Sequence, residues 1–131
     1  MERQSLRYWP LWAAVGWMLV GVVVYLSLTP KPPELPGPLA WDKLDHLVAY
    51  GALMGWFAQL YRTRRAHGVV AVAFILLGVA LEFLQHAGGQ RTPDVTDMLA
   101  NGLGVLLAWR LARTRFALLL SMVERKLLQV A

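Results

Sequence analysis

The residues able to do chemistry in this sequence are carboxylates, a histidine, amides and two cations, which stand in three short stretches of an otherwise apolar chain. They are Asp42, Lys43, Asp45 and His46 in the first stretch, Glu82 and Gln85 in the second, and Arg91, Asp94, Asp97 and Asn101 in the third. Most neighbours within a stretch are three or four residues apart, a spacing that places side chains on one face of a helix. The chain has no cysteine, which excludes thiolate nucleophiles and cysteine-ligated metals.

These residue types fit three tasks. In the first, Lys43 and Arg91 bind the phosphate or carboxylate of an anionic envelope lipid or cell-wall precursor, while the acids orient the two cations. In the second, the cluster is an enzyme site acting on a lipid-linked phosphate or glycan, with His46, Glu82 and Asp97 as the catalytic candidates. In the third, the charges form only a structural ion network. The residues favour binding and leave catalysis open.

A metal cofactor is an open alternative within the enzyme hypothesis. Asp94 and Asp97, three residues apart, could hold a hard divalent ion together with Glu82, because such ions prefer oxygen ligands. The sequence contains no metalloprotease signature and no nucleotide-binding loop that would support the enzyme hypothesis. The sequence therefore predicts no specific cofactor.

Long apolar runs must position these residues. The chain is 57% hydrophobic and 16% charged, which indicates lipid rather than water as the solvent. Trp9–Leu28 is twenty residues without a charge, enough to cross a hydrocarbon core of about 30 Å. Leu44–Tyr61, Gly68–Gln85 and Val95–Ala112 are mostly apolar and reach the lower limit of spanning length. We therefore expect an all-α membrane protein, a bundle of four transmembrane helices.

The remaining segments frame that bundle. The proline-rich stretch Thr29–Pro38 predicts an extended linker outside the bilayer core. The tail Arg115–Ala131 places apolar residues at helical spacing and its charges off that face, so it predicts an amphipathic helix at the membrane interface. The expected organisation is an N-terminal segment (1–8), a four-helix domain (9–113) and an interfacial C-terminal helix (114–131).

The basic residues predict the orientation. Ten of the thirteen fall in the termini and in the loop after Tyr61, whereas Lys31, Lys43 and Arg91 fall on the other side. Since Lys and Arg accumulate in cytoplasmic loops, both termini should be cytoplasmic and the polar cluster should face outward. Because the positive charge follows this topology, nucleic acid is not an expected partner, and membrane lipids are.

Three blocks in these stretches resemble a known family. DKLDHLVAYGAL, GVALEFLQ and QRTPDVTDMLANGLGVLLAW are similar to the D-K-x-x-H, E-x-x-Q and R-x-x-D-x-x-D-x-x-x-N-x-x-G signatures of VanZ-like membrane proteins, over residues 42–110. The resemblance implies a small helical protein of the bacterial inner membrane. It also implies a link to low-level resistance to the glycopeptide teicoplanin.

Simple structural roles compete with the functional ones. Asp94 and Asp42 could cap helix N-termini, and Glu82 could pair with Arg91 or Lys43. His46 and Asn101 could form hydrogen bonds between helices. Small residues at Gly51, Gly55, Gly102 and Gly104 predict close helix packing.

Overall fold

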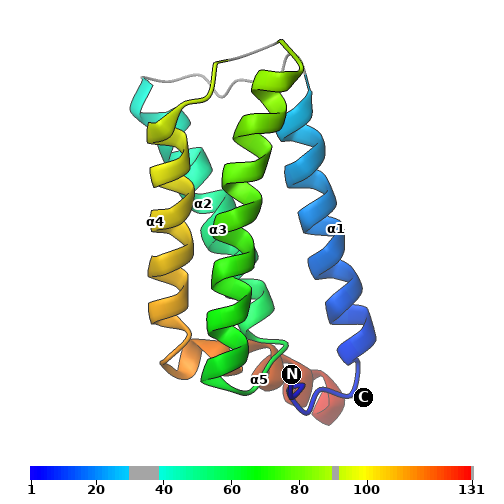
Figure 1. Cartoon of the computed structure of the whole chain (residues 1–131). Coiled ribbons are helices and arrows are strands. Elements are labelled where there is room, and N and C mark those ends of the chain that lie inside the picture. Colours follow the sequence, from blue (N-terminus) through cyan, green and yellow to red (C-terminus); the bar gives the residue numbers. More distant parts are fainter. Residues whose placement is uncertain (30–38, 90–91, 131) are drawn as a thin grey trace.

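The computed structural model describes residues 1–29, 39–89 and 92–130, and these residues form an all-α structure (Figure 1). The elements are α1 (Trp9–Leu28), α2 (Leu39–Ala58), α3 (Arg64–Ala87), α4 (Val95–Leu111), the short 3₁₀ helix η1 (Arg115–Leu118) and α5 (Leu119–Val130). The four long helices run alongside one another, and α5 lies across the end of the bundle where both termini are found (Figure 1). The expected four-helix arrangement with a helical tail is therefore present.

The most extensive helix contact joins α2 and α4. A methyl group on Gly104 would lie 2.1 Å from the carbonyl oxygen of Leu47, and one on Gly51 would lie 3.3 Å from the carbonyl oxygen of Gly104. Only glycine permits this approach of two backbones, so the predicted close packing is confirmed for Gly51 and Gly104. Gly55 instead faces Phe116, and Gly102 faces open space.

The helix boundaries differ from the expected ones where caps decide them. The bounds of α1 are as predicted, whereas α3 begins at Arg64 because the Thr63 hydroxyl accepts the N–H of Ala66 at 3.2 Å. Arg64 and Arg65, expected in the loop, therefore belong to the helix. Because α2 begins at Leu39, Asp42 lies in its first turn and is not the N-cap that the sequence allowed.

Two of the four long helices, α1 and α3, are long and apolar enough to cross a membrane by length and composition. Helix α4 has 17 residues, and α2 carries three charges, Asp42, Lys43 and Asp45, near its start. All four helices expose large apolar side chains, among them Leu11, Val48, Val72 and Leu103. The composition of the helices thus identifies two candidate spans rather than four.

The amphipathic helix α5 docks through an unexpected residue. Leu119, Val123 and Leu127 of its apolar face are exposed, whereas Glu124 is only 5% exposed. The Glu124 carboxylate accepts the N–H groups of Arg7 and Tyr8 at 2.7 and 2.8 Å and the Trp12 indole N–H at 3.1 Å. Burial disfavours the charge, but these three donors outweigh it and hold the pKa of Glu124 below its ordinary value. Glu124 thereby satisfies the N-terminal end of α1.

Candidate functional site

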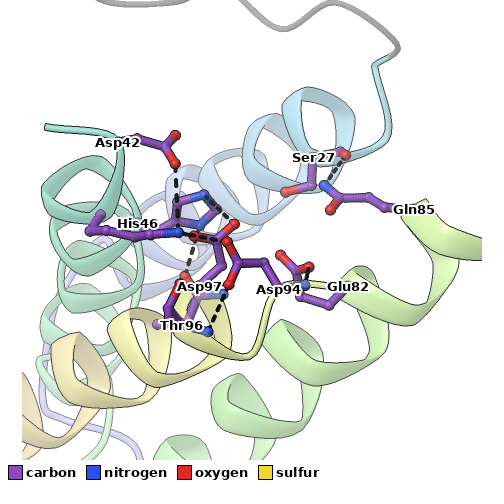
Figure 2. Close-up of polar contacts among 10 residues, drawn as sticks. Ser27, Asp42, His46, Glu82, Gln85, Asp94, Thr96 and Asp97 are labelled. Carbon is purple, nitrogen blue, oxygen red and sulfur yellow. Dashed lines mark hydrogen bonds and ion pairs between the residues drawn. The ribbon is translucent and has the colours of Figure 1, made fainter. Parts of the chain in front are cut away.

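The site lies at the end of the bundle away from both termini, where α2 and α4 begin and α3 ends. Its centre is the Lys43 ammonium group, which donates to Asp94 Oδ2 at 2.8 Å and to Asp97 Oδ1. A third carboxylate oxygen, on Asp42, lies 3.9 Å from Lys43 Nζ. Figure 2 shows Asp42, Asp94 and Asp97 close together at the starts of α2 and α4. One cation therefore bridges two carboxylates, of α4 and its N-cap, and balances the charge of only one of them.

His46 joins the same cluster one turn further along α2. Its Nδ1 lies 3.0 Å from Asn101 Oδ1, and its Nε2 lies 3.7 Å from Asp97 Oδ2. Since an amide oxygen only accepts, Nδ1 donates in this bond and Nε2 is left facing the carboxylate. His46 and Asn101 were each expected to form a hydrogen bond between helices, and the structure shows that they bond to each other, which orients the imidazole.

Asp94 and Glu82 hold the start of α4. The Asp94 side chain accepts the N–H of Thr96 at 2.8 Å, which confirms its predicted role as an N-cap. Glu82, which is 4% exposed, accepts the N–H of Asp94 at 3.1 Å. Hydrogen bonds from Lys43 and from Thr96 keep the pKa of the Asp94 carboxyl well below its ordinary value. Both side chains are therefore engaged in hydrogen bonds at the start of α4.

Three predicted site residues are not part of this cluster as described. Asp45 is exposed and takes part in no ion pair of the described residues. The Gln85 amide donates to the carbonyl oxygen of Ser27 on α1, so it turns toward α1 (Figure 2). Arg91 lies outside the described residues, and its pairing with Glu82 stays a prediction.

A cavity of about 400 Å³ opens beside the cluster. Its lining includes the carboxylates Asp42, Glu82, Asp94 and Asp97, together with Gln85 and Thr92. Lys43 is already engaged by two of these acids, so the described wall is predominantly acidic. A wall of this kind suits a cationic group or a metal ion better than a bare anion.

Three of the side chains lie close enough together that they could hold a metal ion. One ligand atom from each of Asp42, His46 and Asp97 lies within 4.8 Å of the other two. Two carboxylate oxygens and an imidazole nitrogen suit a divalent ion such as Mn²⁺ or Zn²⁺. This set differs from the combination of Glu82, Asp94 and Asp97 considered from sequence, because Glu82 and Asp94 are used at the helix start.

Two contacts around the cluster had no role in the sequence-based prediction. The Thr96 hydroxyl donates a hydrogen bond to the Asp94 carboxylate, and the Ser27 carbonyl oxygen accepts one from the Gln85 side-chain amide. Thr96 carries a local signal, since it lies two residues after a predicted N-cap. Ser27 carries none, because its role depends on how α1 packs against α3.

The fold and the site together define a small all-α protein with two candidate membrane spans among the described residues and a polar cluster at one end. The VanZ/LLP1 family model matches residues 9–120. The chain therefore belongs to the VanZ/LLP1 family, which confirms the resemblance found in the sequence. No curated protein and no solved structure matches the chain.

Proposed function

We propose that this protein crosses the bacterial cytoplasmic membrane four times, with both termini inside, and that its polar cluster faces outward. There the cluster binds the phosphate-bearing head group of an anionic envelope lipid or lipid-linked cell-wall precursor. Through this binding the protein affects susceptibility to teicoplanin-type glycopeptides. The observation that carries the proposal is the convergence of Lys43, His46 and Asp97 beside an open, polar cavity.

The charge balance of the cavity supports a divalent ion as part of this binding. Four carboxylates line the cavity, and Lys43 forms ion pairs with two of them, Asp94 and Asp97. A phosphate would be repelled by this wall unless more positive charge were present. An ion held by Asp42, His46 and Asp97 would supply that charge and leave coordination positions for phosphate oxygens.

The free-energy cost of inserting charged side chains into a membrane favours a ligand-binding role for the cluster over a role in helix packing alone. A charged side chain at the membrane centre costs about 2.5–3.5 kcal/mol on insertion scales, and less toward the interface. The close contact of Gly51 with Gly104 already joins α2 and α4 without any charge. A cluster of several charges on the same two helices is therefore better explained by binding.

The test is retention of lipid by the purified full-length chain, measured by native mass spectrometry. We expect phosphatidylglycerol to bind in the presence of Mn²⁺ and to be lost after chelation. Asp42→Asn should abolish the Mn²⁺-dependent part, whereas Asp45→Asn, the same change at an exposed position three residues later, should retain it. Equal retention by the two variants would contradict the proposal.

A metal-dependent enzyme is the second candidate function. The ligand set Asp42, His46 and Asp97 favours it, because an ion placed there could polarise a phosphoester at the cavity. The two functions differ in the fate of the lipid. A binding protein returns it unchanged, whereas an enzyme releases a product, and Asp97→Asn would abolish that release.

A further inference from the structure

A second cavity lies at the opposite end of the bundle, near the N-terminus of the chain. Its volume is about 470 Å³, and it is enclosed by the N-terminal segment, the loop between α2 and α3, the first turn of α3 and the end of α4. Its wall contains three arginines, Arg62, Arg64 and Arg113, and no carboxylate among the described residues that line it. Every ion pair among the described residues involves Lys43 or His46, so these guanidinium groups are not neutralised by a described acid.

Arg113 is fixed without using its hydrogen-bonding capacity. Its guanidinium carbon lies 4.2 Å from the centroid of the Trp109 ring. Stacking engages the flat face of the guanidinium group and leaves its N–H groups able to bind a ligand in the plane. The side chain is thus positioned at low entropic cost for an anion.

The start of α3 adds neutral donors and a favourable dipole. The hydroxyl oxygen of Thr63 accepts a hydrogen bond from the N–H of Ala66, and its carbonyl oxygen accepts one from the N–H of His67. The N–H groups of Arg64 and Arg65 precede them and have no partner within the helix. His67, 6% exposed, donates from Nε2 to the Tyr61 carbonyl oxygen at 2.9 Å, so its ring supports the wall and the arginines and the helix N-terminus supply the donors for a ligand.

We propose that this arginine pocket, lined by Arg62, Arg64 and Arg113, binds the phosphate group of an anionic phospholipid. Guanidinium groups recognise phosphate through paired N–H donors, and a helix N-terminus adds positive potential. The volume falls in the range of ligand pockets, about 300–1,000 Å³, so it accommodates a head group rather than a single ion. The ends of the candidate spans α1 and α3 flank the pocket, where lipid head groups lie.

The experiment measures the melting temperature of the full-length chain in a neutral detergent with added phosphatidylglycerol, phosphatidylcholine or inorganic phosphate. We expect phosphatidylglycerol to raise Tm and phosphatidylcholine to leave it nearly unchanged. The double variant Arg64→Gln/Arg113→Gln should lose at least half of the rise. Arg65→Gln, which removes one positive charge next to Arg64 but outside the pocket wall, should keep it.

Each other outcome is also decisive. An equal rise in the double variant and in Arg65→Gln, or an equal rise with phosphatidylcholine, would overturn the proposal. The same rise with inorganic phosphate alone would support the anion site and overturn the lipid as its source. If the double variant does not fold, Arg62→Gln, at an exposed position of the wall, replaces it. The measurement is made in the presence of a chelator, which removes the Mn²⁺-dependent lipid binding proposed for the polar cluster and so separates this pocket from it.

Discussion

The contact of α4 with α2 at Gly104 makes a strong prediction about stability. In Gly104→Ala the new methyl carbon would lie 2.1 Å from the Leu47 carbonyl oxygen, whereas ordinary contact begins at 3.4 Å. The helices would have to separate by more than an ångström, because the obstacle is backbone and cannot rotate away. Overpacking of this kind costs about 1–3 kcal/mol, and the better helix propensity of alanine returns about 1 kcal/mol at most.

We therefore expect Gly104→Ala to lose about 2 kcal/mol, which corresponds to a fall in Tm of roughly 8 °C. The matched control is Gly102→Ala on the same helix, where no atom lies within 4 Å of the added carbon. This control should be neutral or more stable by up to about 1 kcal/mol. The assay is thermal unfolding in detergent, followed by far-UV circular dichroism, which reports helix content. If the two variants melt at the same temperature, α2 and α4 do not cross at Gly104.

Three further predictions concern the Lys43–Asp97 ion pair, the buried Glu124 and the orientation in the membrane. A double-mutant cycle of Lys43→Met and Asp97→Asn should show a coupling of about 1–2 kcal/mol in unfolding free energy, because one partner is buried and the other is partly exposed; additive losses would remove the pair. Glu124→Gln should destabilise the chain by about 1–2 kcal/mol at neutral pH through loss of the charged cap of α1. Because the pKa of Glu124 is lowered by folding, this difference should shrink as the pH falls below about 4.5, and a constant difference would contradict the role. The chain has no cysteine, so Gly89→Cys and Arg64→Cys can be labelled singly in intact cells, where an impermeant reagent should modify only the first.

Local patterns predicted the parts of the fold that local forces decide. The uncharged run Trp9–Leu28 gave the bounds of α1, and Pro93 followed by Asp94 marked the start of α4. The start of α3 was placed too late because the three arginines after Tyr61 read as a loop. The Thr63 cap and the helix propensity of arginine decide that boundary instead.

Helical spacing also brought most of the candidate site together correctly. Asp42 and His46 are four residues apart and meet Asp97 from the facing helix. Asp45, three residues from Asp42, was included by the same argument, but it is exposed and takes part in no ion pair of the described residues. Which acid pairs with which cation depends on the rotation of each helix about its axis. Residue spacing along the sequence does not specify this rotation.

The contacts made by the C-terminal helix α5 could not be predicted either, because they depend on tertiary packing. Glu124 lies off the apolar face of α5, a position typical of a solvated charge. Its burial follows from where α5 crosses the N-terminus of α1, which is a tertiary contact over more than a hundred residues of chain. Gln59 is used in the same way, since its side-chain oxygen accepts the N–H of Leu120 at 2.8 Å.

The most direct test of the proposed site is the affinity of the purified chain for Mn²⁺, measured by electron paramagnetic resonance as the loss of the free-ion signal. We predict one bound ion per chain in the wild type and in Asp45→Asn, and an affinity at least tenfold lower in Asp42→Asn and in His46→Ala, since each removes one of three ligands. Circular dichroism on the same samples verifies that all variants are folded. Equal Mn²⁺ affinity in Asp42→Asn and Asp45→Asn, with both folded, would show that Asp42, His46 and Asp97 do not form a metal-dependent ligand site.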